Sequence, residues 1–534
     1  MFVIFDKETS KVIALFENDS IDIADDRILP VMFPNRTSLG IWRANLPKHF
    51  TPSYLTVKLD AINDNLVSIL YKNREIYKVT SEEHDAYQAK KWVTKRKKLY
   101  GLYPAGFLRS VIDRTTKMWR VSPYTDTSLL PSVENMSYFS DNKVIPVGWW
   151  GPFTDAGGYA SMNREIVFRL HNHHVIARAE ICPTAPQISS LSQYYLSHYT
   201  SIDLSHFRRY PRVWAFTPIP HPPHDGKNIF FTMMETESLH PEFVRICNAY
   251  SNEVWVPSSH NARVFAQAGI KKPIYTIPLG IDETLYKYDQ RLPTGVITEP
   301  HRFVNALGRP MEDGIKKFRF LTLFGWSFRK GPDILIRSFV KAFTDDDDVA
   351  LLVVSRYAGS DRRQANVILS DIMRYAQSIR SRNHPQILLY PDVVPEQQMP
   401  SLYRMGHAFI HTSRGEGFSL PQIEASACGL PVISCNNTGM SEYLRDDNSY
   451  MITNDKTEIG SPEMHWITSY YHNQLFPKLG EEQEEQAVRH MRYVRDHYED
   501  AICKGARLRE LVFSQYTWRH ASSRVAKRLR EIHG

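Results

Sequence analysis

Cysteine is scarce in this chain, and its few copies lack metal-binding spacing. The 534 residues include only five cysteines, an odd number with no Cys-x-x-Cys pair. Disulfide-stabilised secreted domains and cysteine-based zinc sites use paired cysteines at short spacings. The sequence therefore predicts a protein of a reducing compartment that has no structural zinc site.

Long apolar runs are also missing. None approaches the roughly 20 residues that a helix needs to cross a bilayer. The opening stretch, MFVIFDKETSKVIALFE, has charges within its apolar part, unlike a secretory signal. We therefore expect a cytoplasmic protein without a transmembrane segment, which at most lies peripherally on a membrane surface.

Acidic residues are nearly absent from residues 86–120. This segment has ten Lys or Arg against one acid, a net charge of +9, which leaves −2 for the rest of a chain whose total is +7. Aromatic residues, Trp92 and Trp119 among them, are interleaved with the cations. The pattern suits nucleic acid through phosphate contacts and base stacking. It suits binding to anionic lipid headgroups equally well. An amphipathic helix that packs its aromatic side chains inward would show the same pattern without binding either partner.

Residues 1–142 show no alternation of strands and helices. Residues 1–80 contain short apolar strands separated by turns, residues 81–120 read as a helix with a break near Gly101, and residues 121–142 are polar. We therefore predict an N-terminal accessory module over residues 1–142, β-rich first and then basic and helical.

From residue 143 onward, strands and helices alternate. Nearly continuous apolar strands such as VALLVVSRY (349–357) indicate parallel sheets covered on both faces. One set fills residues 143–287. A second set fills residues 288–510, which begin with a polar stretch at 288–317. The prediction is an α/β chain with two Rossmann-like domains that face a cleft, where ligands usually bind at the carboxyl ends of the strands.

One short segment, RGEGFSLPQIEASACGLPVIS (414–434), combines glycines, a helix start and two glutamates. The Pro at 421 fits the first turn of a helix. The amides of this helix end would point at a ligand and hold a phosphate; they belong to Gly417, Phe418, Ser419 and Leu420.

The two glutamates fit the groups on either side of such a phosphate. Glu416 lies just before the helix and would face whatever is attached to the phosphate. Glu424 lies deeper in the helix and could accept hydrogen bonds from vicinal hydroxyls, such as those of a ribose. One carboxylate for a sugar, one for a ribose and amides between them describe a nucleotide-sugar site.

The Glu416-x7-Glu424 pair resembles the signature of retaining GT-B glycosyltransferases of the glycosyltransferase-4 type. FGWSFRKGPDILIRSF (324–339) is similar to the phosphate-binding strand, loop and helix of that family, and GPFTDAGGYASMNRE (151–165) to its N-terminal glycine loop. The stretches TMMET, EVWVPS and YTIPLGID resemble its first-domain strand ends. YTWRHAS (516–522) resembles the start of the helix that crosses back to the first domain, here residues 511–534. The resemblance covers roughly residues 143–534.

The resemblance implies a role for each matching position. Lys330 would neutralise the departing diphosphate, Glu416 would contact the transferred sugar and Glu424 the ribose. Gly157 and Gly158 would let the backbone approach the diphosphate, and Glu235 would face the cleft at a strand end as a further catalytic acid. The expected donor-site residues are Gly157, Gly158, Arg329, Lys330, Arg414, Gly417, Phe418, Ser419, Leu420 and Glu424.

The chain departs from that family at two positions. Gly325–Trp326 stands where many members have a glycine–arginine pair, so a second cation would come from Arg329, Arg356 or Arg414. Met233 and Met234 stand where many members have a histidine. We expect the acceptor to lie near His221 of the HPPH loop and near Trp92 and Trp119.

The resemblance implies transfer of a sugar from a nucleotide-sugar, UDP- or GDP-linked, to a hydroxyl with retention of configuration. It implies no metal and no cofactor beyond that donor. A glycan, a lipid-linked glycan, a protein or modified DNA bases all remain candidate acceptors. A nucleotide-sugar hydrolase or epimerase of the same fold is an alternative, and so is a non-catalytic sensor.

Two further patterns could suggest metal ligands. The run DDDD (345–348) lies between a predicted helix and strand, and we interpret it as a solvated loop. His171, His173 and His174 follow a predicted helix, where histidines suit the negative helix end.

Overall fold

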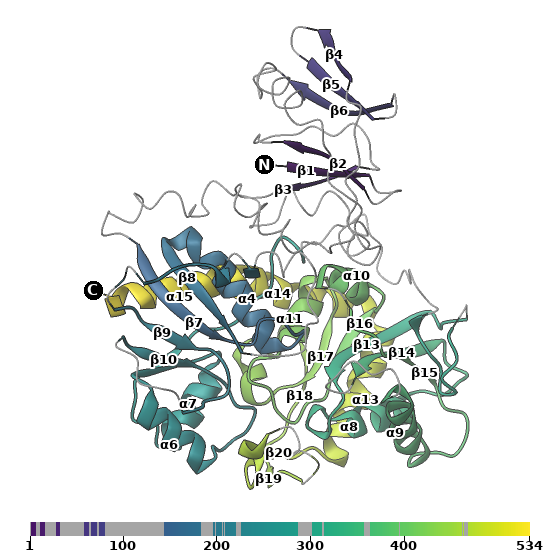
Figure 1. Cartoon of the computed structure of the whole chain (residues 1–534). Helices are drawn as coiled ribbons and strands as arrows, with labels where there is room; N and C mark the ends of the chain where they lie inside the picture. The colour runs from purple at the N-terminus through teal and green to yellow at the C-terminus, as the bar shows by residue number, and fades with distance from the viewer. Residues whose placement is uncertain are drawn as a thin grey trace. The chain divides into compact units, whose positions relative to one another are not determined.

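The computed structural model (Figure 1) describes two parts of the chain. The described residues are 2–6, 11–16, 28–32, 58–63, 66–71, 74–80, 144–182, 196–197, 199–205, 207, 209–220, 226–286, 302–311, 314–356, 364–394, 396–461, 463 and 468–533. One unit comprises residues 1–143 and 189–202, and the other comprises residues 144–188 and 203–534. Each unit is described by itself.

The described strands of the first unit form two small antiparallel sheets. The strands are β1 (Phe2–Asp6), β2 (Lys11–Phe16), β3 (Ile28–Met32), β4 (Lys58–Asn63), β5 (Leu66–Tyr71) and β6 (Arg74–Thr80). Their orders are β2-β1-β3 and β4-β5-β6. The β-rich start predicted from the sequence is therefore present. The basic helix and the polar linker predicted at 81–142 lie outside the described residues.

The second unit contains two six-stranded sheets, each belonging to one lobe. The first lobe has the order β12-β11-β10-β9-β7-β8, and every pairing in it is parallel. Its strands are β7 (Ile145–Gly151), β8 (Val175–Ile181), β9 (Arg212–Trp214), β10 (Asn228–Phe231), β11 (Glu253–Val256) and β12 (Ile274–Thr276). Its helices are α4 (Gly158–Leu170), α6 (Pro241–Tyr250) and α7 (Ser259–Gln267), with η4 (His171–His173) after α4.

The second lobe repeats the arrangement with the order β15-β14-β13-β16-β17-β18, again all parallel. Its strands are β13 (Phe318–Gly325), β14 (Val349–Arg356), β15 (Gln386–Tyr390), β16 (Ala408–His411), β17 (Val432–Cys435) and β18 (Tyr450–Ile452). Its helices are α8 (Pro332–Ala342), α9 (Ala365–Gln377), α10 (Met399–Arg404) and α11 (Leu420–Ala427), with short turns η6 (Phe328–Lys330), η8 (Glu396–Gln398) and η9 (Thr438–Glu442). Two Rossmann-like parallel sheets with covering helices make the GT-B fold predicted from the sequence.

Local sequence explains why these elements begin where they do. Pro332 occupies the first turn of α8, where its missing N–H leaves no bond unmade. The hydroxyl of Ser258 caps α7 by accepting from the amide of Asn261 at 3.2 Å. Residues 349–355 of β14 are all buried, as a central parallel strand requires.

Beyond β18, the chain forms a small hairpin and three long helices. The hairpin pairs β19 (Thr457–Ile459) with β20 (Leu475–Pro477) in antiparallel fashion, and η10 (Ser469–Tyr471) lies just before β20. The helices are α13 (Glu481–Asp496), α14 (Tyr498–Gln515) and α15 (Trp518–His533).

The last of these helices, α15, packs against α4 and β7 of the first lobe. Arg528 forms an ion pair with Glu253 at 2.7 Å, and Arg530 donates to the carbonyl of His173 at 2.8 Å. The chain therefore crosses from the second lobe back to the first.

Candidate functional site

The loop between β16 and α11 lies directly against the first lobe. A Cβ atom at Gly415 would overlap the carbonyl oxygen of Glu235, and one at Gly417 would meet Met233 Cγ at 2.6 Å. The hydroxyl of Ser258 donates to the carbonyl of Gly417 at 3.2 Å. Glycine is therefore needed at both positions for the two lobes to approach this closely.

The same loop carries backbone amides at the start of α11. Within the described part of the chain, no acceptor bonds the N–H groups of Gly417, Phe418, Ser419 or Leu420. The first three of these residues are buried, and Ser419 has a φ of 71°, which is unusual outside glycine. Buried donors at the positive end of a helix form an anion-binding arrangement.

Glu416 lies at the centre of a cluster of donors. Its carboxylate accepts from Lys330 Nζ at 2.5 Å and from His411 Nε2 at 2.9 Å, both through Oε1. Its other oxygen faces Arg329 Nη1 at 3.4 Å. The side chain is buried, and its backbone N–H donates to the hydroxyl of Thr438 at 2.8 Å. Glu416 is therefore fixed in one orientation before any ligand binds.

The charges in this cluster follow from burial and from each other. Burial alone would raise the pKa of Glu416, but Lys330 and Arg329 outweigh it and hold that pKa well below its usual range. Burial and Arg329 lower the pKa of Lys330, while Glu416 acts in the opposite direction. Burial also lowers the pKa of His411. A neutral His411 must then carry its proton on Nε2 to donate to Glu416.

Arg329 connects Glu416 to the first lobe. Its Nη1 donates to the carbonyl of Gly415 at 2.5 Å, and its Nη2 lies 3.6 Å from Glu235 Oε1. The second oxygen of Glu235 accepts from the hydroxyl of Tyr471 at 2.7 Å. Burial would lower the pKa of Arg329, but Tyr471, Glu235 and Glu416 raise it, so the guanidinium stays charged. Its buried Nε has no hydrogen-bond partner among the described residues.

Glu424 lies within α11 and contacts a separate pair of hydroxyls. Tyr403 of α10 donates to Glu424 Oε2 at 2.7 Å, and Tyr286 is a second partner. Burial raises the pKa of Glu424 to about 7, more than these hydrogen bonds lower it. This carboxylate therefore changes charge close to neutral pH.

The structure thus brings Glu416, Lys330, Arg329 and Glu235 together at one place. Arg414 contacts a different residue and forms a bidentate ion pair with Asp333, at 2.8 Å for both contacts. Such a pair fixes the start of α8.

Other predicted residues occupy the first lobe or the neighbouring strand. Gly157 and Gly158 begin α4, and the N–H of Gly157 bonds Asp155 Oδ1 at 2.7 Å. Arg356 ends β14, where burial lowers its pKa and Asp155 acts in the opposite direction. His221, Trp92 and Trp119 lie outside the described residues.

The structure adds several residues to the site that were not predicted from the sequence. They are His411, Thr438, Tyr403, Tyr286 and Tyr471. His411 could have been found as the polar end of buried β16, five residues before Glu416. Tyr471 follows a stretch without periodicity, and no local signal marks it.

The acidic run and the histidines that were considered as metal ligands lie in connections of the fold. Asp345–Asp348 lie in the connection between α8 and β14, and His171–His173 form η4 after α4. Among the described residues, no group of three His, Cys, Asp or Glu could hold a metal ion. No described helix is long and apolar enough to span a membrane.

Comparisons with known proteins identify similar sequences. Residues 317–461 match the family model described as glycosyl transferases group 1. The O-antigen chain mannosyltransferase B of Escherichia coli is 36% identical over 72 residues, which are 14% of this chain and 19% of that protein. The putative glycosyltransferase 45 of a Sulfolobus islandicus filamentous virus is 24% identical over 256 residues, 47% of this chain and 59% of that protein. The chain thus spans less than two thirds of either relative.

Solved structures share the fold. Sucrose-phosphate synthase from Thermosynechococcus elongatus superposes with a TM-score of 0.50 at 13% sequence identity, covering 73% of this chain and 99% of that one. This likeness shows that the second unit has the GT-B fold. The matched segment, residues 317–461, lies in the second lobe and contains Glu416 and Lys330, so this part of the chain is similar to glycosyl transferases of group 1.

Proposed function

We propose that this protein transfers a sugar from a nucleotide-sugar to an acceptor hydroxyl with retention of configuration and without a metal ion. The observation that carries the proposal is the contact of two cations, Lys330 and Arg329, with the buried carboxylate of Glu416. The amides of residues 417–420 follow it in the chain and bond no acceptor among the described residues. These groups offer a diphosphate both charge and directed hydrogen bonds.

In this proposal, stabilisation of the leaving diphosphate accounts for most of the lowering of the activation barrier for sugar transfer. The bond between the anomeric carbon and the diphosphate oxygen breaks, and negative charge develops on that oxygen. Preorganised donors aimed at developing charge lower such a barrier without reorganising. Lys330, Arg329 and the amides of α11 are donors of this kind, so the electrostatic role of a metal is filled by the protein.

The remaining steps follow from retention. The acceptor oxygen attacks the anomeric carbon from the face that the diphosphate leaves. A diphosphate oxygen takes the acceptor proton, so the products are a glycoside and a nucleoside diphosphate. In this proposal Glu416 contacts the transferred sugar and Glu424 accepts from the ribose.

Donor turnover tests the proposal. Purified protein is incubated with UDP-, GDP-, ADP- and dTDP-sugars, and nucleoside diphosphate release is measured with and without added glycans. Mannosyl donors belong in the panel because one relative is named a mannosyltransferase. We expect release from one donor, unchanged by EDTA, and an anomeric configuration of the product equal to that of the donor. Release from no donor would refute the proposal, and loss with EDTA would refute its metal-independent part.

A further inference from the structure

The segment between β18 and α13 reaches across to the first lobe. It contains β19 and β20, and we call residues 457–461 and 468–477 the bridging hairpin. The amide of Glu237 donates to the carbonyl of Leu475 at 2.8 Å. The amide of Leu475 donates in return to the hydroxyl of Ser238 at 2.9 Å. The hairpin is therefore held by hydrogen bonds to the loop that follows β10.

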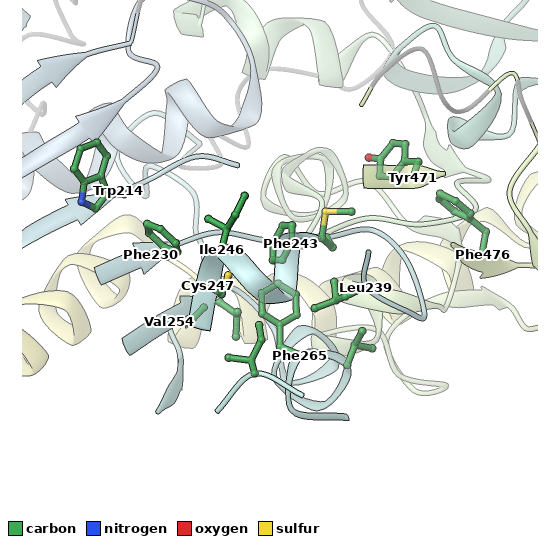
Figure 2. Close-up of a cluster of buried hydrophobic side chains, with 14 residues drawn as sticks. Trp214, Phe230, Leu239, Phe243, Ile246, Cys247, Val254, Phe265, Tyr471 and Phe476 are labelled. Atoms are coloured by element: carbon green, nitrogen blue, oxygen red, sulfur yellow. The ribbon is translucent and has the colours of Figure 1, made fainter. Parts of the chain in front are cut away.

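Aromatic side chains of the bridging hairpin also enter the core of the first lobe. Figure 2 shows Tyr471 and Phe476 in one cluster with Leu239 and Phe243. Tyr471 and Phe476 are 2% and 0% exposed. Although the hairpin belongs in sequence to the second lobe, its side chains complete the packing of the first.

The hydroxyl of Tyr471 forms a hydrogen bond to a charged residue of the site. That hydroxyl donates to Glu235 Oε2 at 2.7 Å, and the Arg329 guanidinium carbon lies 6.0 Å from the Tyr471 ring centre. Burial and Glu235 raise the pKa of Tyr471 well above its usual range, so the phenol keeps its proton and remains a donor. The hydrogen bond fixes one oxygen of Glu235 and leaves the other for Arg329.

A continuous chain of polar contacts therefore runs from the bridging hairpin to Glu416. Tyr471 holds Glu235, Glu235 lies 3.6 Å from Arg329, and Arg329 lies 3.4 Å from Glu416. Without the phenol, the Glu235 carboxylate could turn both oxygens toward Arg329. The guanidinium would then be drawn toward the first lobe and away from the developing charge of a leaving group.

We propose that the bridging hairpin is a positioning element of the donor site and that Tyr471, acting through Glu235, holds Arg329 where the departing diphosphate needs it. This inference rests on the proposed function. It makes Tyr471 a positioning residue, since it acts on Arg329 through Glu235.

The neighbouring tyrosine gives a matched control. Tyr470 also lies in η10, and its hydroxyl donates to the carbonyl of Pro218 in the first lobe at 3.0 Å. Its ring packs against Phe243, with centres 5.4 Å apart. Tyr470→Phe and Tyr471→Phe each remove one hydroxyl and one bond between the lobes. A hairpin with only a structural role would give equal effects.

The test compares steady-state nucleoside diphosphate release by these two variants in the full chain. A hydrogen bond to a charged group supports about a tenfold effect, so we expect Tyr471→Phe to lower kcat about tenfold and to change the donor KM by less than about threefold. Tyr470→Phe should keep kcat within about twofold. Equal losses in both variants would overturn the inference.

A double-variant measurement tests the inference even if the single variants are less stable than the wild type. If Tyr471 acts through Glu235, then Tyr471→Phe should add no further loss of kcat in a Glu235→Gln protein. A full additional loss would overturn the inference even if both variants melt at lower temperature. Wild-type protein that turns over no donor would instead refute the proposed function together with this inference.

Discussion

Four side chains balance their own charge at the centre of the site. Lys330 and Arg329 face Glu416 and Glu235, and two of these four, Arg329 and Glu416, are buried. Burying an unpaired charge is costly, whereas a paired and hydrogen-bonded set persists. The two carboxylates therefore stabilise Lys330 and Arg329 in place when no anionic ligand is bound.

Replacing Lys330 removes one of those cations. We expect Lys330→Ala to lower kcat about 10²- to 10³-fold, as loss of a preorganised donor to developing charge does. Lys341→Ala is a matched control, because Lys341 lies on α8 and pairs with Glu484 at 2.7 Å. Initial rates of nucleoside diphosphate release measure both. Similar rates for Lys330→Ala and Lys341→Ala would contradict the site assignment.

Glu424 makes donor affinity depend on pH. Its pKa of about 7 means that it is protonated at pH 6 and ionised at pH 8. If the ionised form accepts from the ribose, the dissociation constant of a nucleotide-sugar should be about tenfold higher at pH 6 than at pH 8. Calorimetric titration measures this, and Glu424→Gln should bind weakly with no such slope. A flat wild-type profile would count against the ribose contact.

Part of the site could be predicted from the sequence because its key residues lie close together in the chain. Glu416 and Glu424 share one loop and helix, and Lys330 lies in a recognisable strand, loop and helix. Tyr471 reaches Glu235 across 236 positions, so only the folded chain shows that contact. Arg414 is predicted to bind the donor, and in the structure its guanidinium pairs with Asp333, the second residue of α8. Roles for all of these residues remain predictions.

At the scale of elements, the glycine loop sets how closely the lobes meet. The contact between Gly415 and the Glu235 carbonyl leaves no room for a side chain. We expect Gly415→Ala to hold the lobes apart and to lower kcat/KM by about tenfold or more, because positioning across the cleft is lost.

A second glycine gives the control for that substitution. Gly480 precedes α13, and a Cβ there would meet nothing within 4 Å. Gly480→Ala should therefore keep wild-type kcat/KM. The melting temperature of both variants should be recorded alongside the rates. Wild-type rates for Gly415→Ala would show that close approach at this loop is dispensable.

Elements with strong periodicity were predicted well, and irregular ones were not. Buried strands such as β14 stand out as apolar runs, and their parallel order follows from the helices between them. The segment 453–480 has no such pattern, since its strands are only three residues long and take their order from contacts with the first lobe. Tertiary contacts decide such segments, and a local pattern cannot show them.

At the scale of the whole molecule, the two lobes form one unit that does not include residues 1–143. We expect deletion of residues 1–142 to keep donor hydrolysis within about twofold, because the site is built entirely from residues beyond 143. Acceptor use should change, since the basic segment 86–120 would be lost.

The comparison requires a panel of acceptors. Transfer rates to glycans, lipid-linked glycans and DNA are measured for the full chain and the shortened one, each normalised to its own hydrolysis rate. Unchanged ratios for every acceptor would show that residues 1–142 do not select acceptors. Loss of hydrolysis would show that the lobes depend on them for stability.

The return of α15 to the first lobe has a consequence for biosynthesis. A ribosome finishes α4 about 360 residues before it finishes α15, which is roughly 20–70 s at about 5–20 residues per second. During that interval the surface of α4 that α15 later covers stays open to chaperones or to neighbouring nascent chains. Chains truncated before residue 518 would lack α15 and would leave this surface of α4 permanently exposed. Premature termination late in translation should therefore destabilise the first lobe, which is encoded early.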